Sequence, residues 1–166
     1  MKLLHPNEYA HSVLDIDINK LWERGIRNLV IDLEDTLITK GNWDIKSKIH
    51  DWLNSVKEKG FGVCLVTNSF YFKKVSEFSK RINMPVINAA FKPFPFAFWR
   101  AMKIVGGTTQ NTAVIGDQLF MDILGGNFVG THTILVKHIS KENNFLRKMM
   151  RELEKKFLKV KAGGGN

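Results

Sequence analysis

The sequence predicts an α/β fold, a three-layer sandwich of the Rossmannoid type whose central parallel sheet of five strands lies between two layers of helices. Two observations carry this prediction. Short apolar runs, mostly rich in β-branched residues, alternate with longer segments in which apolar residues recur every three or four positions. A chain of 166 residues with 44% hydrophobic residues is also the right size for one globular domain.

Each element follows from its local pattern. A short helix is expected over residues 17–24, closed by Gly25. The expected strands are residues 28–32, 62–67, 85–89, 113–117 and 133–137. The expected helices between them are residues 44–59, 71–82, 95–105 and 118–128. Asp44 is a candidate N-cap for the first of these four, and Gly60, Gly106 and Gly130 mark expected helix ends.

The chain is expected to divide into three segments. Residues 1–24 form an N-terminal segment with its short helix, residues 25–140 the sheet domain, and residues 141–166 a basic amphipathic helix with a frayed tail. The terminal helix, over residues 143–161, has an apolar stripe, and most of its basic residues lie elsewhere. Docking of this helix on the sheet is the favoured interpretation, and contact with an anionic membrane is the alternative.

Composition and charge narrow the possible partners and cellular location. The 25 basic and 16 acidic residues give a formal charge of +9, which favours anionic partners such as phosphoesters, anionic lipid or nucleic acid. The single cysteine, Cys64, lies in an apolar run, so a disulfide or a cysteine-based zinc site within the chain is not expected. Residues 1–11 do not resemble a secretory signal, and no stretch reaches the roughly 18 apolar residues of a membrane span. The expected location is the cytoplasm.

Polar side chains follow four of the expected strands. In an open parallel sheet, ligands bind beyond the carboxyl ends of the strands. These ends carry, in chain order, Asp32 with Glu34, Asp35 and Thr36, then Thr67 with Asn68, then Lys92, and finally Asp117 with Asp122. Carboxylates from different strands suit Mg²⁺, and a hydroxyl and an ammonium group can hold phosphoryl oxygens. The pattern therefore predicts phosphoryl transfer with a carboxylate nucleophile.

The order of these residues resembles the four motifs of the haloacid dehalogenase (HAD) superfamily of aspartate-nucleophile phosphatases. Residues 32–36 resemble its Asp-x-Asp-x-Thr motif, Thr67 the end of its second motif, Lys92 its lysine, and residues 116–122 its Gly-Asp-x-x-x-x-Asp motif. Residues 25–32, 116–127 and 133–137 are further similar to the YqeG type, which includes phosphatidylglycerophosphate phosphatases. The resemblance spans about residues 10–150 and implies an HAD-like fold for the sheet domain.

The resemblance implies that Asp32 attacks phosphorus and that residue 34 protonates the leaving oxygen and later activates water. The family motif has aspartate at that position, whereas this chain has Glu34. Glutamate keeps the main-chain carbonyl and a carboxyl of similar pKa, but its extra methylene moves that carboxyl by over about 1 Å. We expect Glu34 to retain the acid and base role. Asp35 is a variable position and receives no implied role.

The remaining site residues are implied to bind the phosphoryl group or the metal. Thr67, Asn68 and Lys92 would grip the phosphoryl group. The implied ligands of Mg²⁺ are the Asp32 carboxylate, the main-chain carbonyl of Glu34 and Asp117, with Asp122 supporting the metal site.

The spacing of the motifs leaves no room for a cap domain. Asp32 and Thr67 are 35 positions apart, and Thr67 and Lys92 are 25 apart. An uncapped site suits a phosphate carried on a lipid headgroup, a protein or a nucleic-acid end. The resemblance favours phosphatidylglycerophosphate at the inner face of the cell membrane. Some aromatic residues around Lys92 should be exposed, although their burial is favoured over lipid contact; they are Phe91, Phe94, Phe96, Phe98 and Trp99.

Two further functions stay open. Glu34 and the charge of +9 would suit a catalytically weakened protein that binds RNA or a ribosomal particle. The sequence lacks the aromatic and glycine signature of a known RNA-binding module, so nucleic acid is the less favoured partner. A phosphoacceptor receiver domain also uses Asp, Thr and Lys around a metal, but usually on the third strand, whereas Asp32 ends the first. The sequence leaves the oligomeric state open.

Overall fold

The computed structural model describes residues 2–139, together with Glu152 and Lys155. These residues form one parallel sheet of six strands in the order β1-β6-β5-β2-β3-β4. The strands are β1 (Glu8–Ala10), β2 (Asn28–Asp32), β3 (Gly62–Val66), β4 (Val86–Ile87), β5 (Thr112–Gly116) and β6 (His132–Val136). The α-helices are α1 (Ile18–Glu23), α2 (Ser47–Glu58), α3 (Phe72–Ile82), α4 (Phe96–Val105) and α5 (Leu124–Val129).

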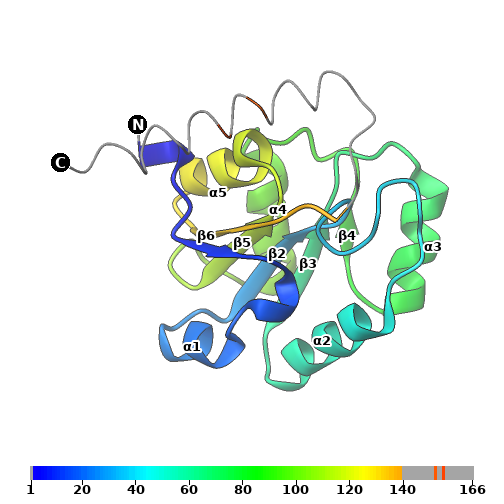
Figure 1. The fold of residues 1–166 in the computed structure, drawn as a ribbon, viewed down its shortest axis with the longest axis horizontal. Coiled ribbons are helices and arrows are strands. Elements are labelled where there is room, and N and C mark those ends of the chain that lie inside the picture. The colour runs from blue at the N-terminus through cyan, green and yellow to red at the C-terminus, as the bar shows by residue number, and fades with distance from the viewer. Residues whose placement is uncertain (1, 140–151, 153–154, 156–166) are drawn as a thin grey trace.

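Shorter helices complete the fold. Two 3-10 helices, η1 (Lys2–Leu4) and η2 (Val13–Asp15), flank β1, and a π-helix, η3 (Leu119–Ile123), leads directly into α5. Figure 1 shows α4 and α5 on one face of the sheet and α1 and α2 on the other. In the part of the chain that the structure describes, no helix has the length and apolar character needed to cross a bilayer.

Two apolar cores hold these layers together, because alternate residues of a strand face opposite sides of the sheet. From β2, Leu29 and Ile31 enter the larger core with side chains of α1, α2 and α3, whereas Val30 enters the smaller core under α4. Cys64 lies fully buried in the smaller core, as the sequence predicts. Burial raises the pKa of its thiol to about 12, so Cys64 is an inert packing residue.

The strand order places a topological switch point beside β2. The chain runs from β2 outward through β3 to β4, and then returns to the other side of β2 to form β5 and β6. Connections on the two sides of β2 therefore diverge at the carboxyl ends of β2 and β5. Such a switch point is where open parallel sheets bind ligands.

All five expected strands are present within one or two residues of their expected ends, and β1 is an addition at the edge of the sheet. It pairs with β6, with Tyr9 opposite Leu135. The sequence gives little signal for β1, since it has only three residues and the Tyr9 side chain is 63% exposed. A short edge strand with one face exposed to solvent lacks the apolar run from which a strand is predicted.

The helix boundaries differ from expectation at one N-cap. Helix α2 begins at Ser47, with Lys46 as its N-cap residue, so the expectation that Asp44 caps it is wrong. Asp44 instead lies in the preceding loop, where its main-chain N–H donates to Asn42 Oδ1 at 3.0 Å. The expected glycine ends are confirmed at Gly106 and Gly130, both in the left-handed conformation that glycine adopts without a steric penalty.

The segment expected as helix over residues 118–128 is divided into two helical types. The π-helix η3 covers its first five residues and α5 the remainder. The wider turn of η3 buries both Asp122 and Ile123. The terminal helix expected over residues 143–161 lies outside the described residues except at Glu152 and Lys155. Both of these are helical, and their side chains form an exposed ion pair of 2.8 Å.

Candidate active site

The loop after β2 presents Asp32 at the switch point. Asp32 is the last residue of β2 and only 4% exposed. The turn that follows is closed by two main-chain bonds, from the N–H groups of Leu37 and Ile38 to the Leu33 carbonyl, at 3.0 and 3.1 Å. This turn brings the Thr36 hydroxyl back to donate to Asp32 Oδ2 at 3.0 Å. The Thr36 side chain is therefore in contact with the predicted nucleophile.

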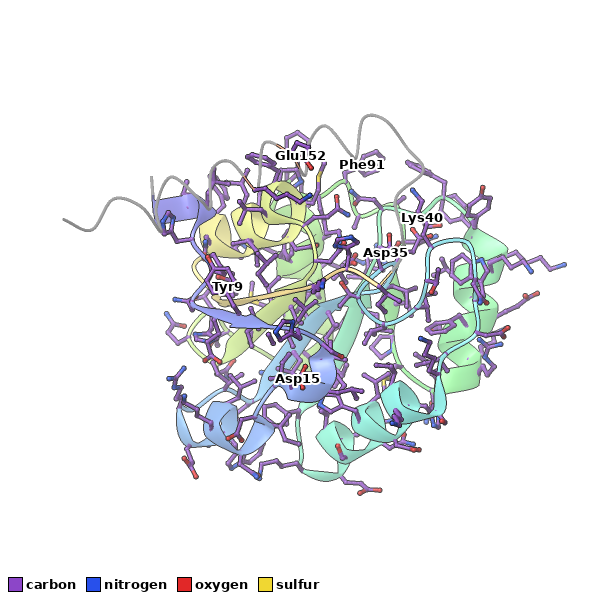
Figure 2. The ribbon with its side chains drawn as sticks, viewed as in Figure 1. Tyr9, Asp15, Asp35, Lys40, Phe91 and Glu152 are labelled. Carbon is purple, nitrogen blue, oxygen red and sulfur yellow. The ribbon has the colours of Figure 1, made fainter. Side chains whose placement is uncertain are left out.

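Asp35 has a structural role that the sequence did not reveal. It is 1% exposed and left-handed, with a φ of 67°, a conformation that aspartate tolerates better than most residues. Its Oδ1 accepts from the Lys40 main-chain N–H at 3.1 Å. Its main-chain carbonyl accepts from the Ile139 main-chain N–H at 3.0 Å. Asp35 therefore ties the turn after β2 to the segment after β6. Figure 2 shows Asp35 and Lys40 on one side of the domain, beyond the ends of the strands.

Lys92 links the loops that follow three different strands. Its ammonium group donates to Asp32 Oδ1, at the end of β2, and to Asp122 Oδ1 at 2.7 Å, after β5. All three side chains are nearly fully buried, at 5% exposure or less. A buried ammonium group between two carboxylates is held by geometry and charge together. The structure thus brings together three residues that lie 30 and 60 positions apart.

Gly116 makes room for this arrangement. A Cβ atom at Gly116 would lie 2.2 Å from Asp122 Cγ, so any larger residue would displace the carboxylate. The second oxygen of Asp122 accepts from the Gln118 main-chain N–H at 3.1 Å. The glycine of the Gly-Asp-x-x-x-x-Asp motif is thereby explained by packing, since it lets the last residue of the motif reach back against the strand.

The loops after β3 and β4 are joined through Asn68. Its amide oxygen accepts from the Lys92 main-chain N–H at 2.8 Å, and its amide nitrogen donates to the Lys92 carbonyl at 3.4 Å. The Thr67 hydroxyl donates to Glu34 Oε2 at 3.4 Å and accepts from the Ser69 main-chain N–H at 3.1 Å. Asn68 thus fixes the backbone of Lys92, and Thr67 connects the loop after β3 to that after β2.

The charges in the cluster act against one another. Burial holds the pKa of Asp32 well above its ordinary value, against the pull of Lys92, and the Asp122 and Asp117 carboxylates raise it further. For Lys92, burial acts to lower the pKa, but the Asp122 and Asp32 carboxylates outweigh it and leave the pKa above its ordinary value. Lys92 is therefore charged, and the site as a whole carries more carboxylate than ammonium.

This excess of carboxylate fits a divalent cation. Asp32, Asp117 and Asp122 are all buried, and each offers a carboxylate oxygen within 4.8 Å of the others. Lys92 contacts this cluster through Asp32 and Asp122, and its single positive charge does not balance three ionised carboxylates. Hard cations prefer such oxygen ligands, and their charge would offset the repulsion among the three carboxylates.

All the predicted site residues lie at or just after the carboxyl ends of β2, β3, β4 and β5. The tight cluster contains Lys92 and the three aspartates, while Glu34 and Thr67 pair beside it. Solvent reaches this edge of the site, because Glu34 is half-buried and Asn68 is exposed. The contacts that sequence reasoning missed are those of Asp35 and Gly116. The glycine could have been recognised from its fixed place before Asp117 in the motif.

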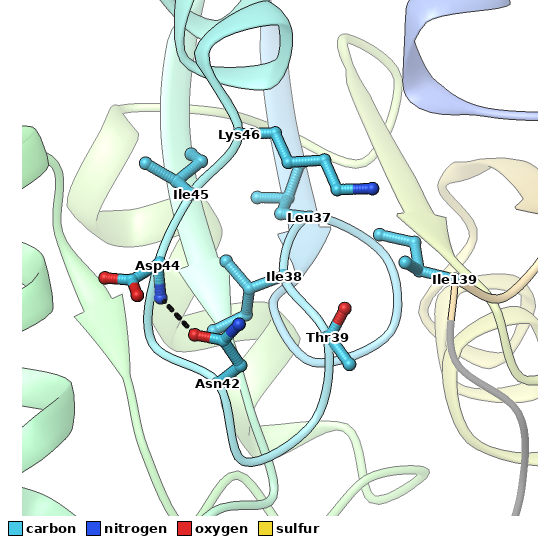
Figure 3. Close-up of a pocket in the computed structure, with 8 residues that line it drawn as sticks. All are labelled: Leu37, Ile38, Thr39, Asn42, Asp44, Ile45, Lys46 and Ile139. Carbon is cyan, nitrogen blue, oxygen red and sulfur yellow. Dashed lines mark hydrogen bonds between the residues drawn. The ribbon is translucent and has the colours of Figure 1, made fainter.

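A separate small pocket lies near the turn after β2. It has a volume of about 130 Å³ and is lined mainly by apolar side chains of this turn, the segment before α2 and Ile139. Figure 3 shows Ile38, Ile45 and Ile139 around it, with the bond between the Asp44 N–H and Asn42 marked. None of the predicted site residues lines this pocket. It borders the turn that Asp35 fixes.

The HAD-hydrolase-like family model matches residues 90–152, which include Lys92, Asp117 and Asp122. Probable phosphatase YqeG of Bacillus subtilis (strain 168) is 33% identical over 157 residues, which cover 95% of this chain and 91% of that protein. The chain therefore belongs to the YqeG-type phosphatases of the HAD superfamily, hydrolases that act on phosphomonoesters.

Solved structures confirm the fold. An uncharacterised protein from Listeria monocytogenes serotype 4b superposes with a TM-score of 0.58 at 14% identity, covering 82% of this chain and 99% of that chain. An HAD phosphatase from Thermococcus onnurineus gives a TM-score of 0.53 at 12% identity, covering 77% and 98%. The cobalt-bound deoxy-D-mannose-octulosonate 8-phosphate phosphatase (YrbI) of Haemophilus influenzae also gives 0.53, at 15% identity, covering 84% and 88%. These likenesses establish the α/β architecture.

Proposed function

We propose that this protein is a Mg²⁺-dependent phosphomonoesterase that forms an aspartyl-phosphate on Asp32 and acts on phosphatidylglycerophosphate. The observation that carries the proposal is the buried cluster in which Lys92 bridges Asp32 and Asp122, with Asp117 beside them. A carboxylate that is desolvated, oriented by two donors and placed at a topological switch point has the surroundings expected of a nucleophile.

The chemistry follows from the placement of the side chains. An Asp32 oxygen attacks phosphorus, the ester P–O bond breaks, and Glu34 gives a proton to the departing alcohol oxygen. Glu34 then takes a proton from water, whose oxygen attacks the phosphorus of the aspartyl-phosphate, so that phosphate leaves and Asp32 is regenerated. The bond from Thr67 to Glu34 supports this role, because it holds the longer side chain at 3.4 Å from the loop after β3.

Binding of the phosphoryl group falls to Thr67, Lys92 and Asn68. Lys92 supplies positive charge beside Asp32, and the side chain of Asn68 fixes the backbone that carries Lys92. The residues that would hold Mg²⁺ are Asp32, Asp117 and the main-chain carbonyl of Glu34, with Asp122 supporting them. A bound cation there would supply charge neutralisation at the phosphoryl group.

The identity of the substrate is the more specific part of the proposal. Between Asp32 and Lys92 the structure describes every residue and contains only α2, β3, α3 and β4, so no cap domain is inserted there. An uncapped site suits a phosphate at the surface of a large assembly. The formal charge of +9 favours an assembly with an anionic surface. We therefore infer a cytoplasmic enzyme, peripheral to the inner face of the cell membrane, that converts phosphatidylglycerophosphate to phosphatidylglycerol in phospholipid biosynthesis.

A substrate comparison tests this function. Phosphate release with Mg²⁺ is measured from phosphatidylglycerophosphate in mixed micelles, a phosphopeptide, a 5′-phosphorylated oligonucleotide and small phosphoesters. We expect the lipid to be preferred and Asp32→Asn to abolish release, while Asp44→Asn, at an exposed acid outside the site, retains it. Unchanged turnover in Asp32→Asn would reject the mechanism, and preference for another phosphoester would reject the lipid.

A further inference from the structure

A group of exposed aromatic rings surrounds the loops that hold Lys92. We call it the aromatic collar and define it as Phe70, Tyr71, Phe72, Phe91, Phe94 and Phe96. Each of these side chains is 58–71% exposed, although phenylalanine is normally buried. Of the four aromatic residues between positions 94 and 99, only Phe98 enters the core, where it is 1% exposed. Such a gathering of exposed apolar side chains marks an interaction surface.

Ring contacts join the two loops of the collar into one surface. The Phe70 and Phe91 rings lie 5.6 Å apart, which connects the loop after β3 to the loop after β4. Phe70 also contacts Phe72 at 6.4 Å, and Phe96 contacts Trp99 at 5.9 Å. Phe91 is left-handed, with a φ of 50°, an uncommon conformation for a bulky residue. The chain therefore accepts backbone strain at the residue that places an exposed ring next to Lys92.

The collar lies on the same side of the molecule as the candidate active site. Ser69 and Ala89 are joined by a main-chain bond of 3.0 Å, and both follow the carboxyl ends of their strands. Figure 2 shows Phe91 on the same side as Asp35 and Lys40. A flat partner that rests on the collar would therefore face the site.

The charge around the collar is positive. Across residues 70–77 and 91–103, four exposed cations, Lys73, Lys74, Arg100 and Lys103, are accompanied by a single acid, Glu77. Aromatic rings flanked by lysine and arginine suit the interface of an anionic bilayer, where the rings enter the headgroup region and the cations meet lipid phosphate.

We propose that the aromatic collar is a membrane-docking surface, which enters the interface of an anionic bilayer and presents the candidate active site to lipid phosphomonoesters. The inference rests on the proposed function and deepens it, because it assigns the lipid contact to a named surface. A second copy of the chain is a poorer occupant, since it would bring the same four cations face to face. RNA also suits a basic surface with exposed rings, so the measurements below test RNA against the bilayer.

Vesicle binding by the full chain tests the surface independently of turnover. Sedimentation is measured in EDTA at 0.15 M salt, with vesicles of phosphatidylcholine alone or of phosphatidylcholine and phosphatidylglycerol. We expect binding to the anionic vesicles, weakened by at least about tenfold in the double variant Phe94→Ser/Phe96→Ser. The matched control is Phe128→Ser, because Phe128 is 61% exposed on α5, outside the collar. Phe128→Ser should bind as the wild type does.

Two further measurements sharpen the test. Brominated lipid should quench the fluorescence of Trp99, and Trp99→Phe should remove most of that quenching, because no other tryptophan contacts the collar in the described residues. Lys73→Glu/Lys74→Glu should reduce the preference for anionic vesicles. Vesicle binding that is not weakened in Phe94→Ser/Phe96→Ser would overturn the proposal that the aromatic collar docks on membranes. Loss of self-association or of RNA binding in that variant, without any vesicle binding by the wild type, would overturn it too.

Failure of the proposed function is distinguishable from failure of this surface. If the collar variants lose vesicle binding but the wild type hydrolyses no phosphatidylglycerophosphate, the surface is supported and the lipid phosphatase function is rejected. If the wild type hydrolyses the lipid and the double variant binds and hydrolyses it equally well in vesicles, the function is supported and the surface is rejected. A soluble phosphoester, hydrolysed equally by wild type and double variant, controls for an intact site.

Discussion

Replacing Asp32 with asparagine should stabilise the metal-free protein while abolishing its activity. Asp32 is buried among Asp117 and Asp122, with one oxygen of each within 4.8 Å of the others. The substitution removes a buried negative charge and keeps both contacts, because the amide oxygen can accept from Lys92 while the amide nitrogen donates to the Thr36 oxygen, which lies 3.0 Å from Asp32 Oδ2. Lys92 keeps its second partner, Asp122, at 2.7 Å.

The expected magnitude follows from the charges. At an effective dielectric constant of about 20, each carboxylate pair within 4.8 Å repels by at least about 3.5 kcal/mol. The lost attraction to Lys92, at a hydrogen-bond distance of about 3 Å, is about 5.5 kcal/mol on the same scale. Removing both repulsions therefore outweighs losing the attraction by about 1–2 kcal/mol, and relief of the buried charge adds to this. We expect Asp32→Asn to raise the free energy of unfolding by about 2 kcal/mol, or roughly 4–8 °C in Tm.

Urea and thermal unfolding in EDTA at pH 7.5 measure this gain, with Asp44→Asn as the exposed control. The pH dependence provides a second check. Burial raises the pKa of Asp32 in the folded state, so the folded wild type binds a proton before the unfolded chain does, and its stability rises as pH falls through that raised pKa. The advantage of Asp32→Asn should therefore shrink towards about pH 4. A destabilised Asp32→Asn, or an advantage independent of pH, would refute the reasoning.

Three further substitutions test neighbouring parts of the site. Lys92→Met should lower the free energy of unfolding in EDTA by about 3–5 kcal/mol and regain part of it with Mg²⁺; no regain would contradict a cation site among the carboxylates. Gly116→Ala should lower stability by about 1–3 kcal/mol and phosphatase activity with it, because its methyl group would displace Asp122, and a fully active variant would contradict this packing. Glu34→Gln should lower kcat by about 10²–10⁴-fold, with Glu34→Asp well above it; equal rates in Glu34→Gln and wild type would exclude proton transfer by Glu34.

The interior strands could be predicted from the sequence because burial on both faces requires mostly apolar residues along the whole strand. All five residues of β2 and of β5 are buried, and a run of apolar residues is the signature of a strand covered on both faces. Elements whose geometry depends on contacts with distant residues have no such local sequence pattern. The edge strand β1 depends on its pairing with β6, and η3 depends on the space that Gly116 leaves for Asp122.

The gathering of the predicted site residues at one edge of the sheet could likewise be predicted, because four ordered motifs place them at the ends of parallel strands. Their supporting contacts could not, since these depend on backbone conformation. Asp35 is an example: its carboxylate and carbonyl bond to Lys40 and Ile139, which requires the left-handed backbone at 67°. Sequence spacing carries no information on the sign of φ for aspartate, whereas for glycine a positive φ is a common expectation.

The substitution of glutamate at position 34 is best understood together with Asp35. The left-handed Asp35 and its bonds to Lys40 and Ile139 fix the backbone immediately after Glu34, so a longer side chain cannot be accommodated by sliding the loop. The carboxyl must be accommodated by the side chain itself, and its bond to Thr67 at 3.4 Å is the contact that the structure provides. The extra methylene therefore places the acid towards the loop after β3, on the side that also carries the aromatic collar. If a bilayer docks on the collar as proposed, a leaving group entering from it would meet Glu34 from that side.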